Sequence, residues 1–142
     1  MKTYKPTSAG RRDSSAINYK EKLTSNSGKP FKGLTKGKRS TGGRNSSGRT
    51  TQLNRGNGNK RTYREVDFKF NKKDIPAVIE TIEYDPFRSG FIALVLYKDG
   101  ERRYILVPQN MKEGDEFIVS ETAKPKLGNR LPLGKIPVGT FV

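Results

Sequence analysis

The fold of this chain is decided by residues 91–107, which read FIALVLYKDGERRYILV. Residues 91–97 form an almost continuous apolar run, which is typical of a strand in the middle of a sheet. Asp99-Gly100 follows, and this dipeptide between two apolar runs is the strongest short signal for a two-residue type I′ turn. Residues 102–107 then run back as the partner strand, and Pro108 ends it. The stretch therefore predicts an antiparallel hairpin at the centre of the domain.

The length of the turn also fixes which side chains meet across the hairpin. With two residues in the turn, Leu94 lies opposite Ile105, and we expect this pair inside the core. The same register puts Tyr97 and Tyr104 on one face of the sheet.

Further strand patterns lie on both sides of this hairpin. Residues 63–70 alternate apolar and polar side chains, residues 75–84 are rich in β-branched and apolar ones, and residues 116–120 follow a turn. Residues 131–137 predict a short helical turn or a loop packed on the barrel, and residues 139–142 predict the start of another strand. These patterns predict an all-β fold, a small five-stranded barrel of the oligonucleotide-binding (OB) type preceded by a long basic extended N-terminal arm. An SH-three-like barrel has a similar strand count and is the alternative.

All of the net charge lies in the N-terminal half of the chain. Residues 1–64 hold 17 Lys and Arg against two acids, whereas residues 65–142 hold 12 of each sign. The whole chain carries a formal net charge of +15. So much uncompensated charge on a short segment indicates a polyanionic partner, of which nucleic acid is the commonest.

Residues 1–61 have the composition of an extended arm. Their apolar residues are isolated, and Gly, Ser, Thr, Asn, Lys and Arg dominate. Such a segment buries too little apolar surface to offset its chain entropy, so we expect it to be disordered alone and ordered on RNA. An inert tail is the alternative, against which stand the interleaved aromatic residues. We therefore divide the chain into a basic extension that we expect to bind nucleic acid, residues 1–61, and a barrel domain, residues 62–142.

The composition argues against an enzyme. The chain has no Cys and no His, which removes the thiolate nucleophile, the commonest general base and the commonest metal ligand. Glu80, Glu83 and Asp85 lie close in sequence and could bind a divalent metal as in a nuclease. We favour the reading in which they are solvent-facing strand residues matched against the basic arm. The sequence contains no phosphate-binding loop of the Walker type and no apolar run long enough to cross a membrane.

A basic stretch marks the junction of arm and barrel. Residues 55–64, RGNGNKRTYR, combine two glycines with four cations and a tyrosine. Gly lets a backbone pass close to another surface, and Arg forms forked hydrogen bonds with phosphate. In the barrel, Arg88, Arg102 and Arg103 add further cations. Arg102 and Arg103 point to opposite faces of a strand, so we expect one of them to pair with a strand acid.

Longer motifs carry a family resemblance. They are KPTSAGRR at 5–12, GGRN at 42–45, KRTYR at 60–64 with VDFK at 66–69, EYDP at 83–86, residues 92–106 and residues 131–140. These motifs span nearly the whole chain in order. On them the chain closely resembles the N-terminal half of the large-subunit ribosomal protein of the universal L-two family.

The resemblance implies an OB barrel whose basic extension threads into large-subunit rRNA, in a non-enzymatic role that supports subunit assembly and the peptidyl-transferase region. The family usually has Gly-Gly-His where this chain has Asn57-Gly58-Asn59, so any role of that imidazole is absent. Family members continue into a second barrel and a basic tail, whereas this chain ends at Val142. We therefore expect a separate chain to carry the C-terminal domain, with a truncated fragment as the alternative. We also expect an organellar, mitochondrial ribosome rather than one of the bacterial cytoplasm.

These observations predict a structural rRNA-binding protein whose partners are large-subunit rRNA and neighbouring ribosomal proteins. No cofactor is expected beyond the structural Mg²⁺ of the rRNA. A free single-strand nucleic-acid-binding OB protein, which would stack bases on aromatic side chains of one barrel face, is the alternative. The residues expected to bind rRNA are Lys5, Arg11, Arg12, Lys29, Lys32, Lys36, Lys38, Arg39, Arg44, Asn45, Arg49, Arg55, Lys60, Arg61, Tyr63, Arg64, Lys69, Arg88, Arg102 and Arg103.

Overall fold

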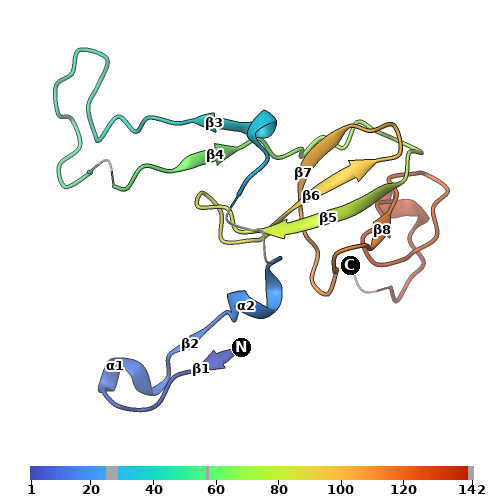
Figure 1. Ribbon diagram of the computed structural model, residues 1–142, viewed down its shortest axis with the longest axis horizontal. Helices are drawn as coiled ribbons and strands as arrows, with labels where there is room; N and C mark the ends of the chain where they lie inside the picture. The colour runs from blue at the N-terminus through green and yellow to red at the C-terminus, as the bar shows by residue number, and fades with distance from the viewer. Residues whose placement is uncertain (25–28, 57, 141–142) are drawn as a thin grey trace.

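The computed structural model describes residues 1–24, 29–56 and 58–140. Its main body is a curled antiparallel sheet with the strand order β7-β6-β5-β8 (Figure 1). The strands are β5 (Ala77–Glu83), β6 (Ile92–Tyr97), β7 (Arg102–Leu106) and β8 (Glu116–Phe117). A fifth extended segment adds to the free edge of β7, where Val66 forms a single parallel bridge with Tyr104. The predicted all-β fold of OB type is confirmed, as a half-barrel of four strands and this bridged segment.

The remaining elements are short. β1 (Lys2–Thr3) pairs with β2 (Ser15–Ala16), and β3 (Thr35–Gly37) pairs with β4 (Thr62–Arg64). The helical turns are α1 (Ala9–Arg12), α2 (Tyr19–Lys22), η1 (Lys32–Leu34) and η2 (Leu133–Lys135). We call residues 1–22 the N-terminal lobe and residues 35–64 the ribbon. Figure 1 shows both projecting from the end of the barrel at which β5 finishes.

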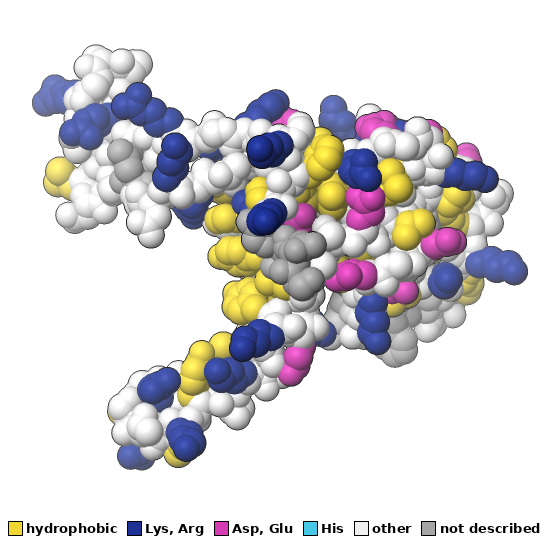
Figure 2. All heavy atoms as spheres, in the orientation of Figure 1, with side chains coloured by type: hydrophobic (Ala, Val, Ile, Leu, Met, Phe, Trp, Pro, Cys, Tyr) yellow, Lys and Arg dark blue, Asp and Glu magenta, His cyan; other side chains and the backbone are white. Residues whose placement is uncertain are grey.

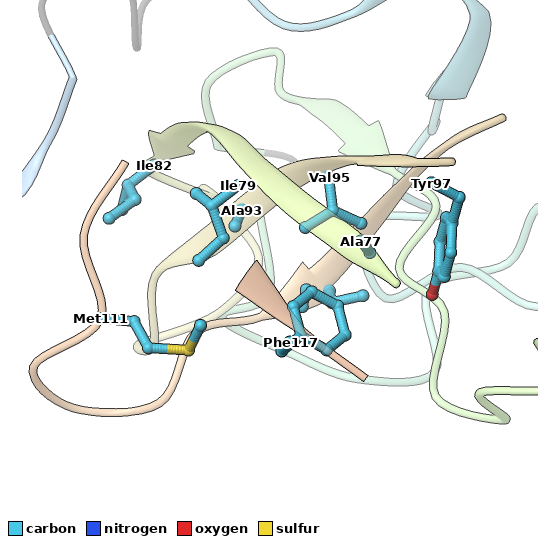
Figure 3. Close-up of a cluster of buried hydrophobic side chains, with 9 residues drawn as sticks. Ala77, Ile79, Ile82, Ala93, Val95, Tyr97, Met111 and Phe117 are labelled. Carbon is cyan, nitrogen blue, oxygen red and sulfur yellow. The ribbon is translucent and has the colours of Figure 1, made fainter. Parts of the chain in front are cut away.

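The larger core lies on one face of the sheet, and Figure 3 shows its side chains converging between β5, β6 and β8. A β-bulge between Ile79 and Thr81 adds one residue to β5. Ile79 and Ile82 therefore both reach this core, although strict alternation would send them to opposite faces. The buried members are Ala77, Ile79, Ile82, Ala93, Val95, Tyr97, Ile105, Met111 and Phe117.

A smaller core lies on the other face. Ile92, Leu94 and Tyr104 form it, and the partly buried Leu34 and Val66 pack against it. Since Leu34 ends η1 just before the ribbon, this cluster attaches the base of the ribbon to the barrel.

The central hairpin forms as predicted, but its predicted register is wrong by one residue. Leu94 pairs with Tyr104, and Ala93 pairs with Ile105. Leu94 and Ile105 consequently belong to different cores, on opposite faces of the sheet. Tyr97 and Tyr104 are separated in the same way, because a one-residue slip moves each side chain to the other face.

The difference arises in the turn. The Tyr97 N–H donates to the Glu101 carbonyl at 3.0 Å, and the Gly100 N–H donates to the Tyr97 carbonyl at 2.9 Å. Three residues, 98–100, therefore form the turn. Gly100 has a φ of +85°, but Asp99 is not among the residues with positive φ, and a type I′ turn needs both. The Asp-Gly signal thus located the hairpin correctly and gave the wrong turn length.

The strand predicted for residues 63–70 is interrupted. β4 ends at Arg64, and beyond it the Asp67 carboxylate accepts hydrogen bonds from the Lys69 and Phe70 backbone N–H groups at 2.9 and 3.0 Å. Phe70 then has a φ of +50°, and Phe68 is 57% exposed. A side chain that captures its own backbone in this way competes with strand pairing.

At the C-terminal end, the short helical turn predicted within residues 131–137 is present as η2. Leu133, expected to pack on the barrel, is 80% exposed, whereas Leu131 and Ile136 are partly buried. The strand expected at 139–142 has its last two residues outside the described part of the chain, and Gly139 lies in a turn.

The proposed division at residue 61 remains a prediction, and several contacts cross it. The Ile82 N–H donates to the Thr24 hydroxyl at 2.8 Å, and the Thr24 N–H donates to the Ile82 carbonyl at 3.1 Å. The Glu65 N–H donates to the Leu34 carbonyl at 2.9 Å. The part of the extension nearest the barrel is therefore fastened to it.

Candidate nucleic-acid interface

Aromatic and cationic side chains interleave where the ribbon meets the loop after β5. We call Lys38, Arg61, Tyr63, Phe87 and Arg88 the aromatic cluster. The Tyr63 and Phe87 rings meet edge to face at 5.5 Å. Arg61 lies 4.7 Å from the Phe87 ring centroid, and Lys38 lies 5.3 Å from that of Tyr63. Cations held against rings in this way are positioned before any partner arrives.

The loop after β5 is shaped by Asp85, which is fully buried. Its carboxylate accepts the Phe87 N–H at 2.9 Å, and its carbonyl accepts the Arg88 N–H at 3.2 Å, which closes a turn around Pro86. The same carboxylate forms an ion pair with Arg88. The Arg61 guanidinium donates to the Pro86 carbonyl at 3.1 Å and ties the ribbon to this loop.

Arg88 is the half-buried cation of the aromatic cluster. Burial opposes its charge, but hydrogen bonds with Tyr63 and Asp85 outweigh burial and raise the pKa of Arg88 above its usual value. Arg88 therefore carries a fixed positive charge at the junction.

A groove of about 790 Å³ runs beside the aromatic cluster. It is lined by residues 37–41 from one side of the ribbon, residues 58–62 from the other, and Phe87. Its charged side chains are Lys38, Arg39, Lys60 and Arg61, with no acid among the lining residues. This combination of one aromatic side chain and four cations suits a nucleic-acid backbone.

The loop at the tip of the ribbon is held in a defined shape. The Gly43 carbonyl accepts the backbone N–H groups of Thr51 and Gln52 at 3.0 and 3.1 Å. Gly43 has a φ of +77°, and a Cβ there would lie 2.5 Å from the Gln52 carbonyl oxygen. Only glycine fits this position, and the fold of the loop leaves the neighbouring Arg44 and Arg49 exposed.

The N-terminal lobe repeats the pairing of cations with an aromatic ring. Lys2 and Arg11 lie 5.6 and 5.1 Å from the Tyr4 ring centroid. Tyr19 in α2 packs edge to face against Tyr84 at 5.7 Å, and this contact joins the lobe to the barrel.

A buried hydrogen-bond network fastens the extension to the sheet. The Phe31 N–H donates to the Tyr104 hydroxyl at 2.8 Å, and that hydroxyl donates to Glu83 Oε2 at 3.0 Å. Burial raises the pKa of Tyr104 to about 12 and raises the pKa of Glu83, although hydrogen bonds to Tyr104 and Thr81 oppose the shift of Glu83. Glu83 is 2% exposed and Asp85 is fully buried, so the expectation that these two acids face solvent is wrong.

Arg64 belongs to the same buried region. It is 6% exposed, and its Nη1 donates to the Thr62 carbonyl at 2.9 Å. Its charge also opposes the rise that burial causes in the pKa of Glu83. Arg64 was predicted to contact rRNA, but the structure places it behind the base of the ribbon with little surface exposed.

Arg102 and Arg103 point to opposite faces of the strand, as expected. Both pair with acids, although the sequence predicts only one such pair. Arg102 forms two hydrogen bonds with Glu80, at 2.8 and 2.9 Å. Arg103 lies 2.7 Å from both Asp67 and Glu101. Burial alone would raise the pKa of Asp67, but hydrogen bonds from Arg103 and from the backbone keep that pKa below its usual value.

Charge is therefore arranged differently in the two halves. Figure 2 shows Lys and Arg spread over both projections, whereas Asp and Glu gather on the barrel. Lys36 is the single predicted rRNA-binding cation of the extension that pairs with an acid among the described residues, through Glu65. The predicted residues that are exposed are Lys5, Arg11, Arg12, Lys29, Lys32, Lys36, Lys38, Arg39, Arg44, Asn45, Arg49, Arg55, Lys60, Arg61, Lys69 and Arg102.

The three acids considered as metal ligands are used separately. Glu80 binds Arg102, Glu83 binds Tyr104, and Asp85 binds Arg88. Across residues 1–24, 29–56 and 58–140, no three His, Cys, Asp or Glu side chains are arranged to hold a metal ion.

The sequence matches the family described as Ribosomal Proteins L2, RNA binding N-terminal domain, over residues 31–120. The chain belongs to this family. The large ribosomal subunit protein uL2 of Nitrobacter winogradskyi is 52% identical over the whole chain, which covers 50% of that protein. The proteins of the same name from Hyphomonas neptunium and Rickettsia bellii are 51% and 58% identical, over 100% and 80% of this chain and 50% and 41% of their own lengths.

This member of the L2 family spans about half the length of the curated relatives it matches. The matched region, residues 31–120, includes η1, the ribbon and the four-stranded sheet. Within the part of the chain that the structure describes, no helix has the length and apolarity needed to cross a membrane.

The sequence did not identify Phe87 as part of this L2-family site. Phe87 supplies the ring on which Arg61 and Lys38 lie. A signal was present in the sequence, because Phe87 directly precedes Arg88 in a loop opened by Asp85-Pro86. An aromatic residue next to a cation in a loop is the pattern that could have identified it.

Proposed function

We propose that this chain is a non-enzymatic, structural component of the large ribosomal subunit that binds rRNA. The observation that carries the proposal is the distribution of charge. Three barrel arginines, Arg88, Arg102 and Arg103, are paired with acids, while the cations of the two projections, apart from the buried Arg64, stay exposed. The family's description as an RNA-binding domain, and the name of the relatives as large-subunit proteins, support it. Recognition is of RNA shape, because phosphate contacts carry no sequence information.

The roles within the site follow from exposure. The exposed cations of residues 1–61 neutralise phosphates, and the aromatic cluster positions two of them, Lys38 and Arg61, at the junction, where Arg88 is paired with Asp85. Arg64, Arg102 and Arg103 act through the fold, since each is hydrogen-bonded within the protein. The barrel domain serves as a rigid body that holds the ribbon, and neighbouring ribosomal proteins are its further partners.

Two finer predictions need their own tests. The relatives reported above are bacterial, so the mitochondrial preference rests on the sequence alone. Mass spectrometry of the intact large subunit from the source organism tests both the compartment and the separate chain expected to carry the family's C-terminal domain. A single polypeptide continuing past Val142 would exclude the separate chain.

Salt dependence of binding tests the function itself. If about ten cations contact phosphate, log affinity for large-subunit rRNA should fall against log salt with a slope of about −7 to −9. Replacing Lys38 and Arg61 with Ala should reduce this slope by about 1–2. Lys112→Ala with Lys124→Ala removes the same charge from exposed barrel positions and is the matched control. A wild-type slope near zero would exclude binding through the extension.

The alternative of a free single-strand-binding protein loses its main support in the structure. Tyr97 and Tyr104 lie on opposite faces and are 1% and 0% exposed, so this pair cannot provide a stacking surface for bases.

A further inference from the structure

Arg130 differs from the other barrel arginines. Arg88, Arg102 and Arg103 are all ion-paired with carboxylates, and Arg64 is buried. Arg130 is exposed, and its guanidinium has neither an ion pair nor a hydrogen bond to any residue that the structure describes. Arg130 is thus an exposed arginine with free donors, on a barrel whose arginines at 88, 102 and 103 all use theirs on carboxylates.

The side chain of Arg130 is nevertheless held in place. Its backbone N–H donates to the Ile118 carbonyl, and its carbonyl accepts the Ser120 N–H, both at 3.1 Å. The guanidinium carbon lies 3.8 Å from the centroid of the Phe70 ring. Stacking on a ring fixes the plane of a guanidinium and leaves its edge donors available for a planar or forked acceptor.

Two more cations share the groove beside Arg130. The groove has a volume of about 230 Å³ and is lined by Lys69, Lys73 and Arg130, with Glu121 as the one acid among its lining residues. Glu121 lies 3.9 Å from Lys73 Nζ and 3.4 Å from the Nζ of Lys135, outside the groove. We call this the Arg130 groove, and its cations outnumber its acid.

The Arg130 groove and the aromatic cluster lie at opposite ends of β5. Lys73 precedes β5, and Arg88 follows it. At about 3.3 Å per residue, the seven-residue strand places roughly 20 Å between the Lys73 side of the groove and Arg88. The Lys69 side comes nearer, because Arg88 lies 5.5 Å from the ring of Phe68, the residue before Lys69. Figure 1 shows β8, beside the groove, at the end of the barrel away from the ribbon. Contacts made at the aromatic cluster therefore leave the groove open.

We propose that the Arg130 groove binds phosphates of a second RNA segment, so that the barrel bridges two segments of rRNA. The proposal rests on the proposed function and adds a second, separate contact to it. A ring-stacked guanidinium flanked by two lysines presents a planar fork and two point charges, which matches the phosphodiester backbone. Binding at the groove needs no movement of the extension.

The test compares variants of residues 1–142 that carry equal charge loss. Arg130→Gln with Lys73→Gln should reduce the salt slope of binding to large-subunit rRNA by about 1–2. Lys112→Gln with Lys124→Gln is the control and should leave the slope close to wild type. In hydroxyl-radical footprints, the groove variant should lose protection of one rRNA region, whereas Lys38→Ala with Arg61→Ala should lose protection of a different one.

A thermal melt checks that each variant folds. If the double variant melts early, Lys73→Gln alone changes a side chain that is 65% exposed and should still reduce the slope by about 1. If the wild-type slope is steep but the groove variants keep the wild-type slope and footprint, the second contact is overturned. The proposed function then remains intact. If those variants lose binding to poly-glutamate instead, an acidic protein surface is the occupant, and the proposal is overturned. A wild-type slope of log affinity against log salt near zero would overturn the proposed function itself.

Discussion

Replacing Tyr104 with Phe removes one hydroxyl and breaks two hydrogen bonds at once. The Phe31 N–H loses its acceptor at 2.8 Å, and the Glu83 carboxylate loses its donor at 3.0 Å. A buried group left without a partner costs about 1–3 kcal/mol. Phe31 is exposed enough for water to replace part of its bond, and Glu83 keeps the Thr81 hydroxyl at 3.2 Å. We therefore expect Tyr104→Phe to lower the free energy of unfolding by about 2–3 kcal/mol.

Urea denaturation monitored by circular dichroism measures this loss, and hydrogen exchange of the Phe31 amide reports the release of the extension. Tyr84→Phe is the matched control, because Tyr84 is 43% exposed and its hydroxyl has no hydrogen-bond partner among the described residues. The control should change stability by less than about 0.5 kcal/mol. If Tyr104→Phe also stays within that range, the network does not fasten the extension, and the reasoning is refuted.

Three further predictions concern single positions. Leu94→Ala should destabilise the smaller core by about 2–5 kcal/mol in urea denaturation, and a loss below about 1 kcal/mol would show that this face is loosely packed. Gly43→Ala should strain the tip loop by about 1–3 kcal/mol and weaken rRNA binding in filter assays. Gly48→Ala, at a φ of +80° with nothing within 4 Å of its Cβ, is its control and should weaken binding less; equal effects would argue against the close contact at Gly43. Burial raises the pKa of Glu83 above 4.5, so its contribution to stability is full below pH 4.5 and is lost as pH rises through the folded-state pKa. Glu83→Gln should abolish that loss in denaturation curves measured across this range, and an unchanged pH profile would contradict it.

Periodicity and turn chemistry located the main strands well. The apolar run before Asp99-Gly100 became β6, and the β-branched run after Ile75 became β5. Those patterns succeed because burial on one or both faces selects residue type locally. Register was harder, because the choice between a two- and a three-residue turn depends on backbone dihedrals that Asp-Gly does not settle.

The burial and the partners of side chains that depend on tertiary contacts could not be predicted from the sequence. Glu83 looked like a solvent-facing strand residue, but a bulge in β5 places it beside Tyr104. Arg64 was indistinguishable from its basic neighbours, although packing at the base of the ribbon buries it. The sequence did not predict a site at Arg130, because that site depends on Phe70 and Lys73, which are distant from Arg130 in sequence.

The hydrogen bond between Phe31 and Tyr104 has a consequence for events at the exit of the translating ribosome. The two residues are 73 positions apart, and Thr24 likewise reaches Ile82 across 58 positions. At about 5–20 residues per second, Tyr104 is synthesised roughly 4–15 s after Phe31. For that interval the basic segment has emerged without the site that later holds it. During this time its cations compete for any nearby polyanion, so the nascent chain is most exposed to wrong partners before the barrel closes.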